Sequence, residues 1–241
     1  MKEVLPYPAL QQDKRQQVSE MFNRIAQSYD FLNHFLSAGV DRNWRKRAVK
    51  ILGDIQAKTI LDVATGTADF ALESAKIQPQ KITGIDLSEN MLAIGRKKIQ
   101  KKNLEEMIHL VQGDCEALPF AENNFDAVTV GFGVRNFMNP VKGLKEMNRV
   151  LRPGGKLVVL EFSKPQNFLV SGLFNFYFRK FCPFIGGVIS KDRNAYRYLQ
   201  SSVADFPDGK DFLSLMETAG FNNTFQQKLT FGIASIYCGT K

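Results

Sequence analysis

The chain has 241 residues, of which 44% are hydrophobic, and this length and composition suit one domain with a sizeable core. Its net charge of +8 is compatible with nucleic acid, an anionic membrane surface or an acidic substrate, and does not choose among them. No apolar run approaches the roughly eighteen residues of a transmembrane helix, and the N-terminus lacks the apolar core of a signal peptide.

The cysteines are few and far apart: Cys115, Cys182 and Cys238. None belongs to a C-x-x-C motif, so they favour reduced thiols and a cytoplasmic location. The two histidines, His34 and His109, do not neighbour a cysteine in the sequence. We therefore expect no metal site.

The N-terminal part of the chain predicts helices and no strand. Residues 18–29 place apolar side chains at helical spacing, and a second helix is predicted over residues 44–52. Residues 1–52 are therefore interpreted as an N-terminal helical cap. The remainder, residues 53–241, is interpreted as an α/β domain.

Strands and helices alternate through most of that domain. Strands are predicted at 59–64, 81–87, 108–114, 125–133 and 156–163, and helices at 68–77, 88–102, 140–151 and 208–221. Ser88 is the expected N-cap of one helix, Pro153-Gly154-Gly155 predicts a turn, and residues 223–241 predict a hairpin. This alternation predicts a mostly parallel sheet with helices on both faces. Its ligand is expected at the carboxyl ends of the strands, beside the first one.

A single glycine follows the first predicted strand, in "LDVATGTADF" (residues 61–70). A dinucleotide-binding turn needs several glycines so that the backbone can approach a pyrophosphate. Because other residues fill the flanking positions here, we do not expect a pyrophosphate site. Gly66 still allows a ligand to come close to the backbone.

Two carboxylates end the next two predicted strands. Asp86 is placed to accept the hydroxyls of a ribose. Asp114 is placed to accept a hydrogen bond from an adenine amino group, with the backbone of Cys115 beside it. Taken singly, Asp86 could instead be a helix cap and Asp114 a solvated loop acid. Together with Gly66 they suit an adenosine without phosphates, such as that of S-adenosylmethionine.

Four stretches carry a resemblance to a known family: "YDFLNHFLSAGVDRNW" (29–44), "EALPF" (116–120), "GFGVRN" (131–136) and "RVLRPGGKLVVLEFSKP" (149–165). The chain resembles the class I S-adenosylmethionine-dependent methyltransferases. More narrowly, it resembles the menaquinone and ubiquinone biosynthesis C-methyltransferase family, over nearly its whole length. The resemblance implies an α/β, Rossmann-like fold with a mostly parallel seven-stranded sheet and a C-terminal antiparallel hairpin.

The resemblance implies methylation of a ring carbon on a polyprenylated quinol, with S-adenosylmethionine as cofactor. The overall resemblance favours demethylmenaquinol as the substrate. The alternatives are the benzoquinol of ubiquinone biosynthesis and another small molecule such as a sterol or a phenol. A non-catalytic adenosine-binding scaffold is the alternative from a different class of protein.

The family's motifs imply roles for individual residues. Arg135 would hold the quinol oxyanion, Asn136 would orient a ring oxygen, and Tyr29 would close over the site. Gly66 and Thr67 would meet the methionine end of the cofactor. For Arg135 the alternative is an ion pair with a nearby carboxylate, and for Tyr29 it is ordinary packing.

Some residues leave their roles open or depart from the family. Asp62 could reach the cofactor amino group through water, or could stabilise the turn. Asp41 stands where the family usually has a histidine, three residues before Trp44, and we assign it no role. Gly131 stands where the family often has serine.

An aromatic and basic insertion is predicted at about residues 165–197. Its phenylalanines are interleaved with basic residues. Together with Lys164, which flanks the insertion, these are Arg179, Lys180, Lys191, Arg193 and Arg197. Apolar rings with cations suit an anionic membrane interface, which would place the protein peripherally at the inner face of the cytoplasmic membrane. They also suit a cap over a prenyl tail, a packed helical lid or a homodimer contact. No RNA-module signature accompanies them, so no nucleic-acid partner is expected.

Overall fold

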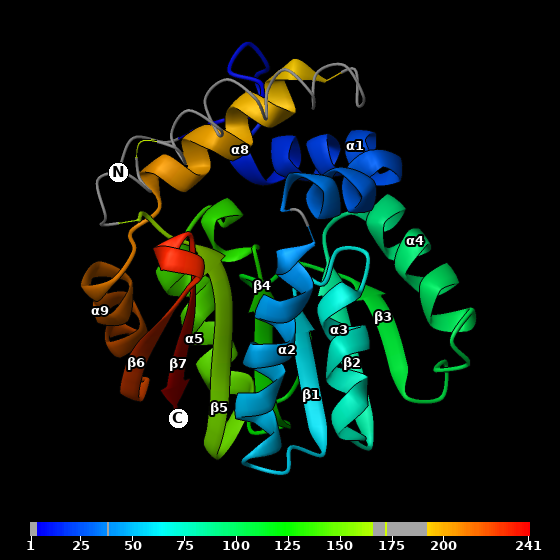
Figure 1. Ribbon diagram of the computed structural model, residues 1–241, viewed down its shortest axis with the longest axis vertical. Helices are drawn as coiled ribbons and strands as arrows, with labels where there is room; N and C mark the ends of the chain where they lie inside the picture. The colour runs from blue at the N-terminus through cyan, green and yellow to red at the C-terminus, as the bar shows by residue number, and fades with distance from the viewer. Residues whose placement is uncertain (1–3, 38, 166–171, 173–191) are drawn as a thin grey trace.

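The computed structural model describes residues 4–37, 39–165, 172 and 192–241, and its centre is a seven-stranded sheet (Figure 1). The spatial order is β3-β2-β1-β4-β5-β7-β6. The strands are β1 (Thr59–Val63), β2 (Lys81–Asp86), β3 (Ile108–Gln112), β4 (Phe125–Gly131), β5 (Leu151–Phe162), β6 (Asn222–Leu229) and β7 (Ala234–Thr240). The first five pair in parallel, whereas β7 is antiparallel to both neighbours. The predicted Rossmann-like sheet with a C-terminal antiparallel hairpin is therefore confirmed.

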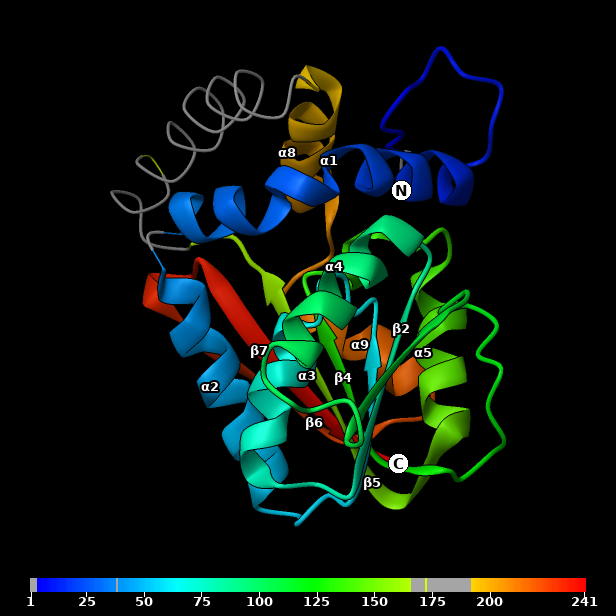
Figure 2. The same ribbon diagram turned by 90° about the vertical axis from the view of Figure 1, so that its right-hand side faces the viewer.

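Helices cover both faces of this sheet (Figure 2). The helices are α1 (Lys14–Leu36), α2 (Val40–Gly53), α3 (Asp69–Ser74), α4 (Glu89–Gln100), α5 (Pro140–Val150), α8 (Arg193–Asp205) and α9 (Lys210–Thr218). Short 3₁₀ turns are η1 (Ala75–Ile77), η2 (Val134–Asn136) and η4 (Thr230–Gly232). One core forms beneath α2 and α3, and the other beneath α5 and α9.

Alternation along β1 explains the two cores. Ile60 belongs to the core under α2 and α3, while Leu61 and Val63 belong to the core under α5 and α9. Successive side chains of a strand point to opposite faces, so an apolar strand in this position packs against helices on both sides. The apolar residues on both faces of "TILDVA" follow from this double burial.

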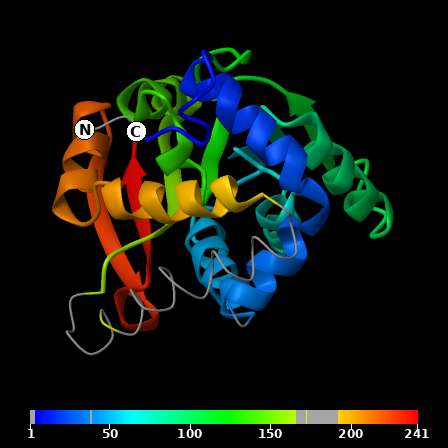
Figure 3. The ribbon, with the colours of Figure 1, turned by 90° about the horizontal axis from the view of Figure 1, so that it is seen from above.

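Two helices lie across the carboxyl ends of the strands (Figure 3). The first is α1, which extends beyond the predicted range of 18–29 at both ends. The second is α8, which was not predicted. They share a third apolar cluster that includes Met21 and Ile25 of α1, Met91 of α4 and Tyr198 of α8. Apolar contacts between helices that are distant in the sequence thus hold α1 and α8 over the carboxyl ends of the strands.

Of the predicted N-cap at Ser88 and the predicted turn at residues 153–155, the structure confirms the first and not the second. Ser88 is the N-cap of α4, and its hydroxyl oxygen accepts a hydrogen bond from the backbone N–H of Met91, as predicted. The predicted turn at residues 153–155 is wrong, because β5 runs through it from Leu151. The strand accommodates these glycines through a register shift against β4, and Gly154 has a positive φ of 78°. Among the described residues, no helix is both long and apolar enough to span a bilayer.

Candidate cofactor and substrate site

A pocket lies between α1 and the carboxyl ends of β1, β2 and β4. Six of the residues predicted from the sequence line it: Tyr29, Gly66, Asp86, Asp114, Cys115 and Asn136. Thr67 and Arg135 do not line this pocket. The pocket sits where β1 lies between β2 and β4, which is the point where the strand order reverses. This is the position at which α/β sheets of this type bind ligands.

The turn after β1 is held open by a buried carboxylate. Asp62 is fully buried and accepts hydrogen bonds from the hydroxyls of Thr65 and Thr129, both at 2.6 Å. Gly66 has a φ of +55°, and a Cβ placed on it would meet nothing within 4 Å. Asp62 therefore stabilises the turn, and Gly66 leaves open space beside the backbone for a ligand.

Asp86 lines the pocket and also organises the surrounding backbone. Its Oδ2 accepts the Gly66 N–H at 2.8 Å, and its Oδ1 accepts the Ser88 N–H at 2.9 Å. Burial raises the pKa of its carboxyl group. Each carboxylate oxygen has a second lone pair, so both can also accept a hydroxyl from a ligand. Asp86 thus ties the Gly66 turn to the start of α4 and fits a ribose.

Asp114 lies beneath the N-terminal end of α1. Arg15 Nη1 lies 2.8 Å from Asp114 Oδ2, and the N–H of Glu116 donates to Oδ1 at 2.8 Å. Arg15 is half-exposed, so this ion pair is open to solvent. The neighbouring Cys115 thiol is buried, and burial raises its pKa. A neutral thiol of this kind contributes packing and not a nucleophile.

Thr67 faces away from the pocket, toward α1 and α4. Its hydroxyl donates to Asp30 Oδ1 at 2.5 Å, and Lys98 Nζ donates to Thr67 Oγ1 at 3.1 Å and to Asp30 Oδ2 at 3.0 Å. These bonds connect the turn after β1 to two helices that cover the site. Thr67 therefore positions the turn.

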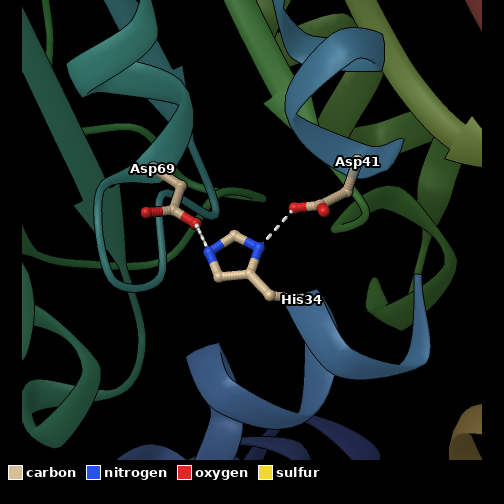
Figure 4. Close-up of side chains that lie close together, drawn as sticks. All are labelled: His34, Asp41 and Asp69. Carbon is tan, nitrogen blue, oxygen red and sulfur yellow. Dashed lines mark hydrogen bonds and ion pairs between the residues drawn. The ribbon is translucent and has the colours of Figure 1, made fainter. Parts of the chain in front are cut away.

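His34, Asp41 and Asp69 lie close together beside this network (Figure 4). His34 Nδ1 lies 2.8 Å from Asp41 Oδ2, and His34 Nε2 lies 3.6 Å from Asp69 Oδ2. The spacing of the three ligand atoms is within reach of a metal ion. However, Arg45 pairs with Asp41 and lies 3.4 Å from Asp69, and Lys98 pairs with Asp69. Arg45 and Lys98 thus already occupy both carboxylates, and Lys98 also pairs with Asp30, which makes this an ion-pair network joining α1, α2, α3 and α4.

Arg135 and Asn136 follow β4 on the turn η2. Arg135 Nη1 lies 2.7 Å from Glu161 Oε1, and the side chains are 3% and 0% exposed. The alternative of an ion pair with a carboxylate is thus observed. Asn136 lines the pocket, and its Nδ2 donates weakly to the Phe132 carbonyl at 3.4 Å.

Several residues near the site were not identified from the sequence. Glu161 had a signal, because it is the acidic residue within the apolar run "KLVVLEF". Phe132 lies within the quoted motif "GFGVRN" and lines the pocket. Arg15 had no signal, because a basic residue at the start of an amphipathic helix is ordinary.

Comparisons with known proteins show the family of the chain. The chain matches the model of the ubiE/COQ5 methyltransferase family over residues 10–241. It is 44% identical over 229 residues to a demethylmenaquinone methyltransferase of Bacteroides fragilis, covering 95% of this chain and 94% of the relative. It is 47% identical over 231 residues to a ubiquinone/menaquinone biosynthesis C-methyltransferase UbiE of Geotalea daltonii, covering 95% and 98%.

A solved structure shows the same fold. This SAM-dependent methyltransferase of Thermotoga maritima superposes with a TM-score of 0.63 at 20% sequence identity, covering 92% of this chain and 99% of the other. That identity supports the fold alone, whereas the family match and the curated relatives span nearly the whole chain. The protein therefore belongs to the ubiE/COQ5 methyltransferase family, and it is an S-adenosylmethionine-dependent methyltransferase.

Proposed function

We propose that this enzyme methylates a ring carbon of a polyprenylated quinol, and that its substrate is demethylmenaquinol. The observation that carries the proposal is the match to relatives named for this reaction over 95% of the chain. The equivalent benzoquinol step is the second candidate, because the name of the Geotalea relative includes ubiquinone as well as menaquinone.

The residues of the pocket fit the cofactor. Gly66 leaves space beside the backbone, Asp86 has lone pairs for ribose hydroxyls, and Asp114 has a carboxylate for the adenine amino group. We assign Cys115 to the wall beside the adenine. The cofactor, when bound, supplies an electrophilic methyl group carried on a sulfonium sulfur.

The substrate must supply an electron-rich carbon. Loss of a hydroxyl proton from the quinol leaves an oxyanion, which pushes electron density onto the ring carbon. That carbon forms the new C–C bond to the methyl group as the methyl–sulfur bond breaks, and the sulfur leaves as a neutral thioether. The ring then regains its aromatic character when that carbon loses its hydrogen as a proton. The protein contributes by aligning the ring and by stabilising the oxyanion.

Arg135, Asn136 and Tyr29 are the residues we assign to the substrate. Arg135 cannot act as a base, because a guanidinium has a pKa above about 12. Its pair with Glu161 fixes the plane of the guanidinium, while its Nε–H has no partner among the described residues and is thus a donor for a substrate oxygen. Asn136 and Tyr29 both line the pocket, where they can orient and cover the ring.

A prenylated substrate is dissolved in a bilayer, so the enzyme must meet a membrane surface. We infer that it does so peripherally, at the anionic inner face of the cytoplasmic membrane. The net charge of +8 supports this inference. The aromatic and basic insertion is our candidate for the contact, and also for a homodimer interface, but most of it lies outside the described residues. Flotation with anionic vesicles tests the contact, and a protein that stays at the bottom of the gradient would contradict it.

The methylation itself is tested with purified enzyme, isotope-labelled S-adenosylmethionine and a short-chain demethylmenaquinone that is chemically reduced. We expect mass spectrometry to find the labelled methyl on the ring carbon. The oxidised quinone is the control, and we expect no product from it because its ring is electron-poor. A reduced benzoquinol assayed in parallel separates the two candidate substrates. Methylation on oxygen, or none on either quinol, would contradict the proposal.

A further inference from the structure

Three buried polar atoms without a hydrogen-bond partner lie where η2 and α8 meet. Within the described part of the chain, five buried side-chain polar atoms have no partner: Ser74 Oγ, Arg135 Nε, Asn136 Oδ1, Asn148 Nδ2 and Tyr198 Oη. Two of the five belong to η2, and Tyr198 belongs to α8, which packs on η2. Buried polar groups are nearly always hydrogen-bonded, so such a group of exceptions beside a ligand pocket needs an explanation.

Tyr198 reaches this position from α8, which lies over the carboxyl ends of the strands. It is 2% exposed, and it belongs to the apolar cluster that contains Met21 and Ile25 of α1. The charges of Arg135 and Glu161 act on its hydroxyl, which places it near that ion pair. Burial raises its pKa well above the ordinary value, so the hydroxyl is a neutral hydrogen-bond donor.

The surroundings offer room for a ligand. A second cavity of about 250 Å³ lies between η2 and α8, and Arg135, Met138 and Ser202 are among its lining residues. Met138 also lines the first pocket, which contains Asn136. Phe137 also lines both pockets, so the two adjoin beside η2, with Asn136 on the first and Arg135 on the second. Tyr198 is not a lining residue of either pocket and lies beside them on α8, which contacts η2. Ser202 lies one helical turn beyond Tyr198 on α8.

The three unpartnered atoms match the polar groups of a quinol that has lost one proton. The ionised oxygen accepts hydrogen bonds, and Arg135 Nε–H and the Tyr198 hydroxyl are two donors. The remaining hydroxyl donates, and Asn136 Oδ1 is an acceptor, with the amide oriented by its Nδ2 bond to Phe132. An apolar residue at position 198 would fill the same space without leaving a buried hydroxyl unpaired.

We propose that the Tyr198 hydroxyl donates a hydrogen bond to the ionised oxygen of the quinol ring, together with Arg135 Nε–H, and that Tyr198 is thus a catalytic residue. This proposal rests on the proposed function. In this proposal α8 both covers the site and supplies a side chain that contacts the substrate. Because the oxyanion forms during the reaction, its donors stabilise charge that develops on the way to the transition state.

The test is Tyr198→Phe, which removes the hydroxyl and keeps the ring. We expect kcat for the quinol to fall by about 10- to 100-fold, as for a lost hydrogen bond to a charged group. The acidic limb of the pH profile of kcat should shift to higher pH, because the oxyanion of the bound quinol is less stabilised and kcat reports ionisations in the enzyme–substrate complex. Affinity for the oxidised quinone should fall by about 3- to 10-fold, since its carbonyl accepts the same bond. Quenching of the single tryptophan, Trp44, reports that affinity without turnover.

Tyr237→Phe is the matched control. Tyr237 is fully buried, and its hydroxyl accepts the Gly209 N–H at 2.9 Å, so its loss should lower the urea midpoint and leave kcat unchanged. Tyr198→Phe should not lower the midpoint, because the Tyr198 hydroxyl has no hydrogen-bond partner in the part of the chain that the structure describes.

The outcomes separate the two proposals. If the wild-type enzyme methylates no quinol, the proposed function fails and the role of Tyr198 fails with it. If the wild-type enzyme is active and Tyr198→Phe has the same kcat and quinone affinity, the role of Tyr198 alone is overturned. A variant whose loss of rate is matched by a lower urea midpoint, with an unshifted pH profile, would show a structural role and would also overturn it.

Discussion

Arg135 and Glu161 form an ion pair that is closed to solvent, with Nη1 2.7 Å from Oε1. Arg135 lies on η2 just after β4, and Glu161 lies near the end of the neighbouring strand β5. Burial raises the pKa of Glu161, and the charge of Arg135 acts in the opposite direction. The pair holds the guanidinium at the edge of the site.

Removing Glu161 should destabilise the fold. Glu161→Ala leaves the Arg135 charge buried without a partner, and we expect the free energy of unfolding in urea to fall by about 3–5 kcal/mol. Glu89→Ala is the control, because it breaks the exposed Arg96–Glu89 pair and should cost less than about 1 kcal/mol. An equal loss of unfolding free energy in the two variants would show that the buried ion pair stabilises the fold no more than the exposed one.

Arg135→Lys should separate charge from geometry. A lysine keeps a cation beside Glu161 but lacks the planar guanidinium and its Nε–H. We expect kcat for the quinol to fall by about 10-fold or more while S-adenosylmethionine affinity, measured by calorimetry, is unchanged. Native turnover in this variant would remove Arg135 from the substrate-binding residues.

The Gly66 turn offers a matched pair of glycine substitutions. Gly66→Ala and Gly154→Ala both place a Cβ at a positive φ, +55° and +78°, with nothing within 4 Å. Each should cost about 1–2 kcal/mol of stability through backbone strain. Only Gly66→Ala should also weaken cofactor binding in calorimetry, because its Cβ enters the pocket. Equal cofactor affinities in the two variants would place the ligand away from Gly66.

Asp86→Asn should weaken cofactor binding by about 10- to 100-fold, because the amide nitrogen donates where a ribose hydroxyl needs an acceptor. Calorimetric titration with S-adenosylmethionine measures this. Asp54→Asn, at the exposed end of α2, is the control and should bind normally. An Asp86→Asn protein with wild-type affinity would exclude the ribose contact.

Asp62 should make stability depend on pH. Burial raises its pKa to about 6, against an ordinary value of about 4. Between about pH 4 and pH 6 the unfolded chain loses this proton before the folded protein does, so this contribution to stability falls by about 3 kcal/mol as pH rises. Urea unfolding of Asp62→Asn should therefore show its largest deficit relative to wild type near pH 4. A deficit that stays constant from pH 4 to pH 7 would contradict the shift.

The sequence by itself determined the order of the first five strands along the chain and the residues at their carboxyl ends. Apolar runs of strand length between helical patterns predict a parallel sheet, and parallel strands end at one edge. Gly66, Asp86 and Asp114 were therefore expected in one place, and they line one pocket. Gly154 and Gly155 led to the wrong prediction of a turn, because an irregular strand accommodates glycines as readily as a turn does.

Only the tertiary structure decided how the covering helices complete the site. Thr67 belongs to the expected motif, yet its hydroxyl binds Asp30 of α1. Arg15 of α1 reaches Asp114, and Tyr198 of α8 reaches the neighbourhood of Arg135. Periodicity along the chain reports which face of an element is apolar, because that depends on local geometry. Which polar side chains of distant elements meet depends on how those faces pack together, and no local pattern records it.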